Sequence, residues 1–249
     1  MIVEYHRPKT IGEALTLLGR SQPLTLPLGG GTVLNRPSAE PVAVVDLQDL
    51  DLDTLRQRGN LLEIGATVTL QTMLEAPALP PALAAAIRRE ATHNLRQMAT
   101  IAGTLVAADG RSPFAVVMLA LDAQVQITAI PKKVSLGNLL PFRSEELRGR
   151  LITQVVVLLN VRLAYEYVAR TPADFPIVCA AIAQWPSGRT RLALGGHGPA
   201  PTLALDGPEA SGAAIAAVSA YSQKGDQWAS AEYRSEVAGV LARRCMEAL

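Results

Sequence analysis

The chain has 249 residues, of which 49% are hydrophobic and 18% charged, which suits one large or two modest globular domains and excludes a disordered or coiled-coil protein. Its 23 basic and 22 acidic residues leave a formal charge of +1, and no basic stripe is present, which argues against a nucleic-acid-binding protein. Cys179 and Cys245 form no CxxC pair, which excludes a thiolate-held zinc or iron–sulfur site within this chain.

Targeting and membrane segments are not predicted. Charges interrupt the N-terminal sequence MIVEYHRPKT where a signal peptide needs an apolar core. No apolar run reaches the roughly 18 residues that a membrane helix needs. We therefore expect no membrane span and a cytoplasmic location.

The N-terminal elements have clear local signals. Thr10 and Glu13 have the spacing of a capping box and predict a short helix that Gly19 ends. Residues 24–28 alternate between leucine and Pro or Thr, which predicts an edge strand because proline cannot donate to a central one. Residues 42–47, VAVVDL, predict a buried strand.

The middle of the chain mixes both kinds of element. A short strand is predicted over residues 61–64, and one helix over 81–98, with a proline in its first turn. Residues 114–121 predict a packed helix. Residues 124–130 and 154–163 predict strands, the second long and aliphatic.

The C-terminal part begins after a seam at residues 165–176, where polar residues and prolines gather. Residues 177–185 and 189–194 predict a hairpin across Pro-Ser-Gly. The last helix presents one apolar face, made by Tyr233, Val237, Val240, Leu241 and Cys245.

Two segments have the composition of phosphate-binding backbone. Leu28-Gly29-Gly30-Gly31-Thr32 would place several N–H groups in one concavity. It fits neither the GxGxxG nor the GK[ST] pattern, and from these residues alone a flexible turn is the favoured interpretation. Thr100-Ile101-Ala102-Gly103-Thr104, followed by Asp109, offers donors and hydroxyls to a diphosphate or ribitol. The other interpretation of this second segment is a tight connection that needs a small residue.

The histidines do not predict a metal site. His6, His93 and His197 are far apart in sequence and lack the HExxH spacing, so surface or capping roles are expected. We predict no metal ligands and no acid–base catalytic residue in this chain.

Six segments in one order resemble the flavin subunits of molybdenum hydroxylases, the family that includes the carbon monoxide dehydrogenase medium subunit and the xanthine dehydrogenase FAD domain. They are YHRPKTIGEALTLLG, LPLGGGTVL, VVDLQDL with LLEIGATVTL, HNLRQMATIAGTL, ALGGHGPAP and DQWASAEYRSEVAGVLARRCMEAL. The match runs almost end to end.

This resemblance implies an α+β fold. Two small α/β subdomains, at about residues 1–54 and 55–164, would form an FAD-binding domain over residues 1–164. A C-terminal domain over residues 165–249 would contain a three-stranded sheet packed with helices.

The resemblance also implies the cofactor site. Backbone N–H groups of the first loop would wrap the FAD pyrophosphate, at Gly29, Gly30, Gly31, Thr32 and Val33. The second loop would comprise Thr100, Ala102, Gly103 and Thr104, with Asp109 in the ribityl and flavin region. Ala102 stands where the family has glycine, and at positive φ it would cost about 1 kcal/mol.

The implied function is electron transfer within a hetero-oligomeric oxidoreductase. Electrons would leave a molybdenum cofactor on a large subunit, pass two [2Fe–2S] clusters on a small subunit, and reach FAD here, which reduces NAD, a quinone or oxygen. The alternative is a flavin-free paralogue that acts as a structural or assembly component. Two departures from the family pattern motivate that alternative: the strain expected at Ala102, and the segment ADGRSPF at residues 108–114, which looks about one residue shorter than its counterpart. It predicts that Ala102→Gly raises flavin occupancy.

Overall fold

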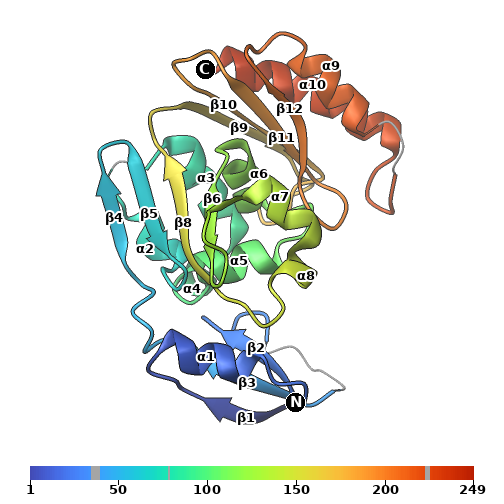
Figure 1. The fold of residues 1–249 in the computed structure, drawn as a ribbon. Coiled ribbons are helices and arrows are strands. Elements are labelled where there is room, and N and C mark those ends of the chain that lie inside the picture. The colour runs from blue at the N-terminus through green and yellow to red at the C-terminus, as the bar shows by residue number, and fades with distance from the viewer. Residues whose placement is uncertain (35–39, 78, 222–224) are drawn as a thin grey trace. The chain divides into compact units, whose positions relative to one another are not determined.

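We describe the chain from a computed structural model, which covers residues 1–34, 40–77, 79–221 and 225–249 (Figure 1). Contacts divide the chain into two compact units, and each is described by itself. The first unit contains Met1–Ala76, His93–Ala107 and Gln124–Val156, and the second contains Pro77–Thr92, Ala108–Ala123 and Val157–Leu249. The domains expected from the sequence, residues 1–164 and 165–249, stay a prediction.

Runs of strands and runs of helices follow one another along the chain, as in an α+β fold. The described strands are β1 (Ile2–His6), β2 (Leu24–Leu28), β3 (Val42–Asp46), β4 (Leu55–Arg58), β5 (Leu61–Gly65), β6 (Gln124–Ile127), β7 (Val134–Ser135), β8 (Ile152–Leu158), β9 (Arg162–Val168), β10 (Val178–Gln184), β11 (Thr190–Gly195) and β12 (Thr202–Gly207). The described helices are α1 (Ile11–Leu18), α2 (Leu70–Leu74), α3 (Pro81–Glu90), α4 (His93–Arg96), α5 (Ile101–Ala107), α6 (Pro113–Ala120), α7 (Leu136–Leu139), the 3-10 helix η1 (Leu140–Phe142), α8 (Arg143–Glu146), α9 (Ala213–Ala220) and α10 (Ala231–Glu247).

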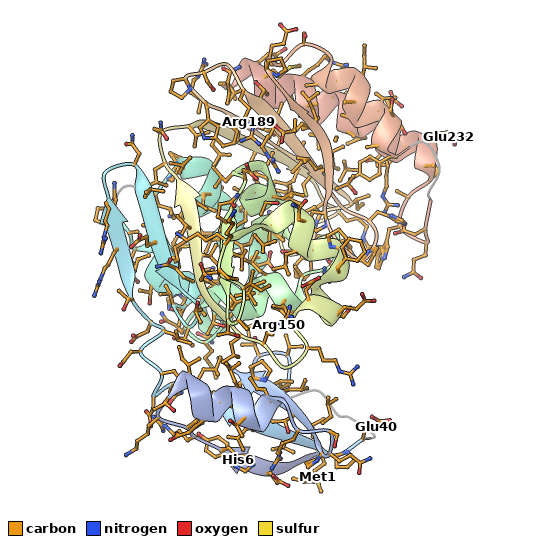
Figure 2. All side chains as sticks on the ribbon, viewed as in Figure 1. Met1, His6, Glu40, Arg150, Arg189 and Glu232 are labelled. Atoms are coloured by element: carbon orange, nitrogen blue, oxygen red, sulfur yellow. The ribbon has the colours of Figure 1, made fainter. Side chains whose placement is uncertain are left out.

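A parallel three-stranded sheet of order β1-β3-β2 begins the first unit, and α1 packs against β2 and β3. Figure 2 labels Met1 and His6 near the ends of β1. The predicted edge strand and buried strand are confirmed as β2 and the central β3. The predicted helix is confirmed as α1, since Thr10 Oγ1 accepts a hydrogen bond from Glu13 N at 3.2 Å.

A five-stranded sheet of order β4-β5-β8-β6-β7 completes the strands of this unit. The strand predicted at residues 61–64 is confirmed as β5. The strand predicted over residues 124–130 is shorter, because β6 ends at Ile127 and Ala129 takes a left-handed φ of 62°.

Two predicted elements are each divided in the structure. The helix expected over residues 81–98 ends at Glu90, because Ala91 is extended (φ −151°, ψ 152°), and α4 follows separately. The strand expected over residues 154–163 is interrupted near Asn160, so that β8 and β9 belong to different sheets.

The second unit is built on an antiparallel four-stranded sheet of order β12-β11-β10-β9. The expectation of three strands was wrong, because β9 begins at Arg162, at the end of the predicted strand, and continues to Val168 within the segment predicted to separate it from the hairpin. Helices α9 and α10 cover one face (Figure 1), and α6 packs against β10 and β11. Burial from both faces explains the continuous apolar sequence of β10. The predicted hairpin is confirmed as β10 and β11.

The last helix is confirmed as α10, but its buried face differs from the expected one. Tyr233 is exposed, whereas Arg234 is fully buried together with Ala238, Leu241 and Cys245. The Arg234 guanidinium is buried because Asp226 Oδ1 accepts from it at 2.9 Å and two backbone carbonyls accept from it as well. Within the described ranges, no helix combines the length and apolarity needed to cross a membrane.

Candidate functional site

The glycine loop follows the carboxyl end of β2, at the edge of the parallel sheet. Its residues 29–32 are half-buried and Val33 is exposed. No hydrogen bond between described residues uses the backbone N–H groups of residues 29–33. Half-buried N–H groups that have no acceptor among the described residues are available to a ligand, because an unpaired N–H shielded from water is costly.

Each of the three glycines in this loop occupies a position where the structure disfavours a side chain. A Cβ at Gly30 would overlap the carbonyl group of Met98, and a Cβ at Gly29 would lie 2.7 Å from Thr100 Oγ1. Gly31 takes a φ of 69°, which L side chains rarely adopt. The backbone of residues 29–30 therefore lies directly against residues 98–100, where no side chain fits at residue 29 or 30. This arrangement fits the phosphates of a nucleotide cofactor.

The second segment is not the loop that the sequence predicted. Residues 102–104 lie in the first turn of α5, where their N–H groups are already engaged. Ala102 N donates to Ala66 O at 3.1 Å, Gly103 N to Thr100 Oγ1 at 3.2 Å, and Thr104 N to Thr100 O at 2.8 Å. This segment shapes the glycine loop rather than offering free backbone donors in the structure.

Ala102 carries no left-handed strain. Its backbone is helical, and the non-glycine residues with positive φ in the described ranges are Asp51, Asp122 and Ala129. The strain expected at this position from the resemblance was therefore wrong. A methyl group fits a helical position at no conformational cost.

We expect Ala102→Gly to leave FAD occupancy unchanged rather than raise it. The substitution exchanges alanine for glycine inside α5, so it should lower the free energy of unfolding by about 1 kcal/mol. Flavin absorbance per protein after loading and desalting, with urea unfolding alongside, checks both effects. A higher flavin content in the variant would restore the view that Ala102 obstructs the site.

Asp109 lies in the second unit, in a turn held from two sides. Its Oδ1 accepts from Arg111 N at 2.8 Å and its carbonyl oxygen from Ser112 N at 3.2 Å. Gly110 N donates to Gly198 O at 2.8 Å, and Gly196 N donates to Gly110 O at 2.6 Å. The side chain of Asp109 is exposed, so the turn presents a fixed carboxylate at the surface of this unit.

The structure also shows a carboxylate enclosed at the C-terminal end of α3. Glu90 Oε2 accepts from Ser112 Oγ at 2.7 Å and from Phe114 N at 3.0 Å. Burial raises the pKa of Glu90 to about 7, although these two hydrogen bonds oppose the shift. The sequence carries no local signal for this, because both partners lie more than 20 residues away along the chain.

The remaining polar candidates do not form a site. His6 Nε2 lies 2.8 Å from Glu4 Oε2, and among the described residues no three His, Cys, Asp or Glu side chains are close enough to hold a metal ion. Cys179 and Cys245 are buried in the second unit, and burial raises the pKa of each thiol to about 12. Both thiols are therefore uncharged at neutral pH and unsuited to nucleophilic chemistry.

A parallel strand that runs into a glycine loop, whose N–H groups have no acceptor among the described residues, is typical of proteins that bind a nucleotide cofactor. Residues 1–157 match the family described as "FAD binding domain in molybdopterin dehydrogenase", and the chain belongs to this family. The expected cofactor, FAD, and the expected class, a subunit of an oxidoreductase, are thereby confirmed.

Relatives extend the match beyond the family's own domain. The chain is 30% identical over 199 residues to YgfM of Escherichia coli (strain K12), which covers 79% of this chain and 75% of that protein. It is 28% identical to the carbon monoxide dehydrogenase medium chain of Afipia carboxidovorans, over 98% of this chain and 95% of that one.

A solved structure shows the same fold. It is the reconstituted CO dehydrogenase from Oligotropha carboxidovorans, with a TM-score of 0.83 and 26% identity, over 98% of this chain and 96% of that chain. The resemblance read from the sequence and the expected α+β flavoprotein fold are confirmed.

Proposed function

We propose that this chain is the flavoprotein subunit of a molybdenum hydroxylase. In this role it binds FAD through the loop of residues 29–33 and passes electrons from a partner's [2Fe–2S] clusters to NAD, a quinone or oxygen. The observation that carries the proposal is the half-buried glycine loop whose N–H groups have no acceptor among the described residues. The medium chains among its relatives support it.

The residues have distinct parts in this proposal. The N–H groups of Gly29, Gly30, Gly31, Thr32 and Val33 bind the pyrophosphate. Thr100, Ala102, Gly103 and Thr104 support that loop through the start of α5, and Thr100 is the residue in contact with it. Asp109 is assigned to the ribityl and flavin region on the strength of the resemblance. When bound, FAD supplies the electron-transfer chemistry, while the protein binds and orients it.

The proposal also includes partners and a location. The molybdenum cofactor would lie on a large subunit and the iron–sulfur clusters on a small one, in a cytoplasmic hetero-oligomer. The two buried cysteines are too few to hold an iron–sulfur cluster in this chain, so any cluster would have to lie on a partner. The flavin-free scaffold loses one of its motivating observations, because Ala102 is unstrained. The shortened segment at residues 108–113 still motivates it.

A visible absorption spectrum tests the proposal. We expect the purified protein, incubated with FAD and desalted, to show a stoichiometric flavin spectrum, with FAD identified by mass after release. A folded protein that remains colourless, alone and with its partner subunits present, would contradict FAD binding and favour the scaffold. Circular dichroism establishes in each case that the protein is folded.

A further inference from the structure

The end of β3 lies next to the start of the glycine loop, within the first unit. β3 is the central strand of the parallel sheet, between β1 and β2, and its last residue, Asp46, pairs in register with Leu28. Leu47 N then donates to Leu28 O at 3.1 Å, and Leu28 directly precedes Gly29. The backbone that follows β3 therefore holds the last residue of β2 in place.

The side chain of Asp46 fixes this backbone. Asp46 is only 3% exposed, and its Oδ1 accepts from Gln48 N at 3.0 Å, which turns the chain over residues 46–48. Its Oδ2 accepts from the hydroxyl group of Tyr5 in β1. Hydrogen bonds to a carboxylate are stronger than those between neutral groups. The hydrogen bond to Asp46 raises the pKa of Tyr5, so the phenol keeps its proton and remains a donor at neutral pH.

These contacts form one path across the sheet to the glycine loop. Tyr5 lies near the carboxyl end of β1, Asp46 ends β3, and Leu28 ends β2. The path therefore joins the three strands at their carboxyl ends, which is where parallel sheets bind ligands. The loop leaves the sheet from a strand end that the other two strands hold.

We propose that Asp46 and Tyr5 are positioning residues for FAD, which hold the start of the glycine loop in the orientation that its N–H groups need to bind the cofactor's phosphates. This inference rests on the proposed FAD binding through residues 29–33. All of its residues belong to the first unit, and neither side chain is assigned a contact with the cofactor. A loop that is held in its binding conformation raises affinity, because less ordering remains to be done on binding.

Asp49 provides a matched control, because it also joins the residues after β3 to those after β1. Arg7 donates from Nε to Asp49 Oδ2 at 2.9 Å and from a terminal nitrogen to Oδ1 at 2.7 Å. Among the described residues, the Asp49 side chain makes no hydrogen bond with Leu28 or with residues 46–48. Asp49→Ala therefore removes a carboxylate from the same end of the sheet and leaves the path from Tyr5 to Leu28 intact.

The test measures FAD binding by fluorescence titration of the full-length protein and its variants. We expect the dissociation constant to rise about tenfold in Asp46→Ala, which loses both hydrogen bonds, and about threefold in Tyr5→Phe, which loses one. Asp49→Ala should change it less than about twofold. The double variant Tyr5→Phe/Asp46→Ala should match Asp46→Ala alone, because both changes remove the same hydrogen bond.

Two further readouts distinguish positioning from a general loss of stability. The phosphorus NMR resonances of bound FAD report the surroundings of its pyrophosphate, and we expect them to shift in Asp46→Ala and Tyr5→Phe but not in Asp49→Ala. Asp46→Asn should restore most of the affinity that Asp46→Ala loses, because its amide oxygen can still accept from Gln48 N.

Wild-type affinity in Asp46→Ala or Tyr5→Phe, or an equal loss in Asp49→Ala, would overturn the inference and leave the proposed function intact. Weaker binding with unshifted phosphorus resonances would overturn it as well. If Asp46→Ala does not fold, Tyr5→Phe decides in the same way, since Tyr5 is exposed and its ring is retained. A wild type that binds no FAD defeats both the proposed function and this inference.

Discussion

Replacement of Gly30 by alanine should weaken FAD binding about 100-fold, which corresponds to about 2.7 kcal/mol. The new Cβ would overlap the carbonyl group of Met98, which is backbone and cannot rotate away. The loop must therefore move, and its N–H groups lose their common direction. Fluorescence titration of the FAD-free protein with FAD measures the dissociation constant directly.

Alanine substitutions at two other glycines should weaken FAD binding less than Gly30→Ala does. Gly31→Ala has room, since its Cβ would lie 3.4 Å from Leu28, but its φ of 69° costs about 1 kcal/mol, so a loss of about fivefold is expected. Gly12→Ala, in α1 with nothing within 4 Å, should leave FAD affinity unchanged and stabilise the fold by about 1 kcal/mol. Equal affinity in Gly30→Ala and Gly12→Ala would remove the glycine loop from the site.

Local chemistry explains which elements the sequence predicts well. The capping contact between Thr10 and Glu13 spans three residues, and the turn between β10 and β11 needs only Pro-Ser-Gly at residues 186–188. In both, neighbours along the chain supply the deciding interaction. The glycine run was identified for the same reason, since left-handed angles and close backbone contacts both demand glycine.

Long-range contacts explain the errors. The helix that begins at Pro81 ends at Glu90, whose carboxylate caps α6 through Ser112 and Phe114. Similarly, Arg234 is buried because it meets Asp226 and the carbonyl of Ile177, which no helical periodicity reveals. The sequence did not predict that the Met98 carbonyl group lies against Gly30. A backbone carbonyl belongs to every residue type, so it leaves no signal in the sequence.

The segment at residues 100–104 shows both a correct prediction from local composition and an error caused by long-range contacts. The composition of residues 100–104 was identified as significant, and the structure does bring Thr100 against the glycine loop. The loop conformation predicted for this segment was wrong, however. Ile101 N donates to Val68 O and Ala102 N donates to Ala66 O, and these hydrogen bonds fix the start of α5. The two segments expected to act alike therefore differ. The N–H groups of residues 29–33 have no acceptor among the described residues. The N–H groups of residues 102–104 are already hydrogen-bonded, and Thr100 in the same segment lies against the glycine loop.

The buried Glu90 should make the second unit less stable as pH rises from about 4.5 to about 7. Its pKa is raised from 4.5 to about 7, so the native state binds a proton in this range that the unfolded state has released. The stabilisation by the protonated form is complete below about pH 4.5 and lost as pH rises through 7. A shift of this size corresponds to about 3 kcal/mol.

Glu90→Gln should abolish this dependence, because glutamine keeps the shape and an acceptor for Ser112 Oγ and Phe114 N without the charge. We expect it to match the wild type at pH 4 and to exceed it by up to about 3 kcal/mol at pH 8. Urea unfolding of the FAD-free protein, followed by tryptophan fluorescence, measures this, since Trp185 and Trp228 both belong to the second unit. The matched control Glu209→Gln, at an exposed carboxylate of the same unit, should keep the wild-type slope. If Glu90→Gln also keeps that slope, Glu90 titrates normally and the burial of its carboxylate has no energetic consequence.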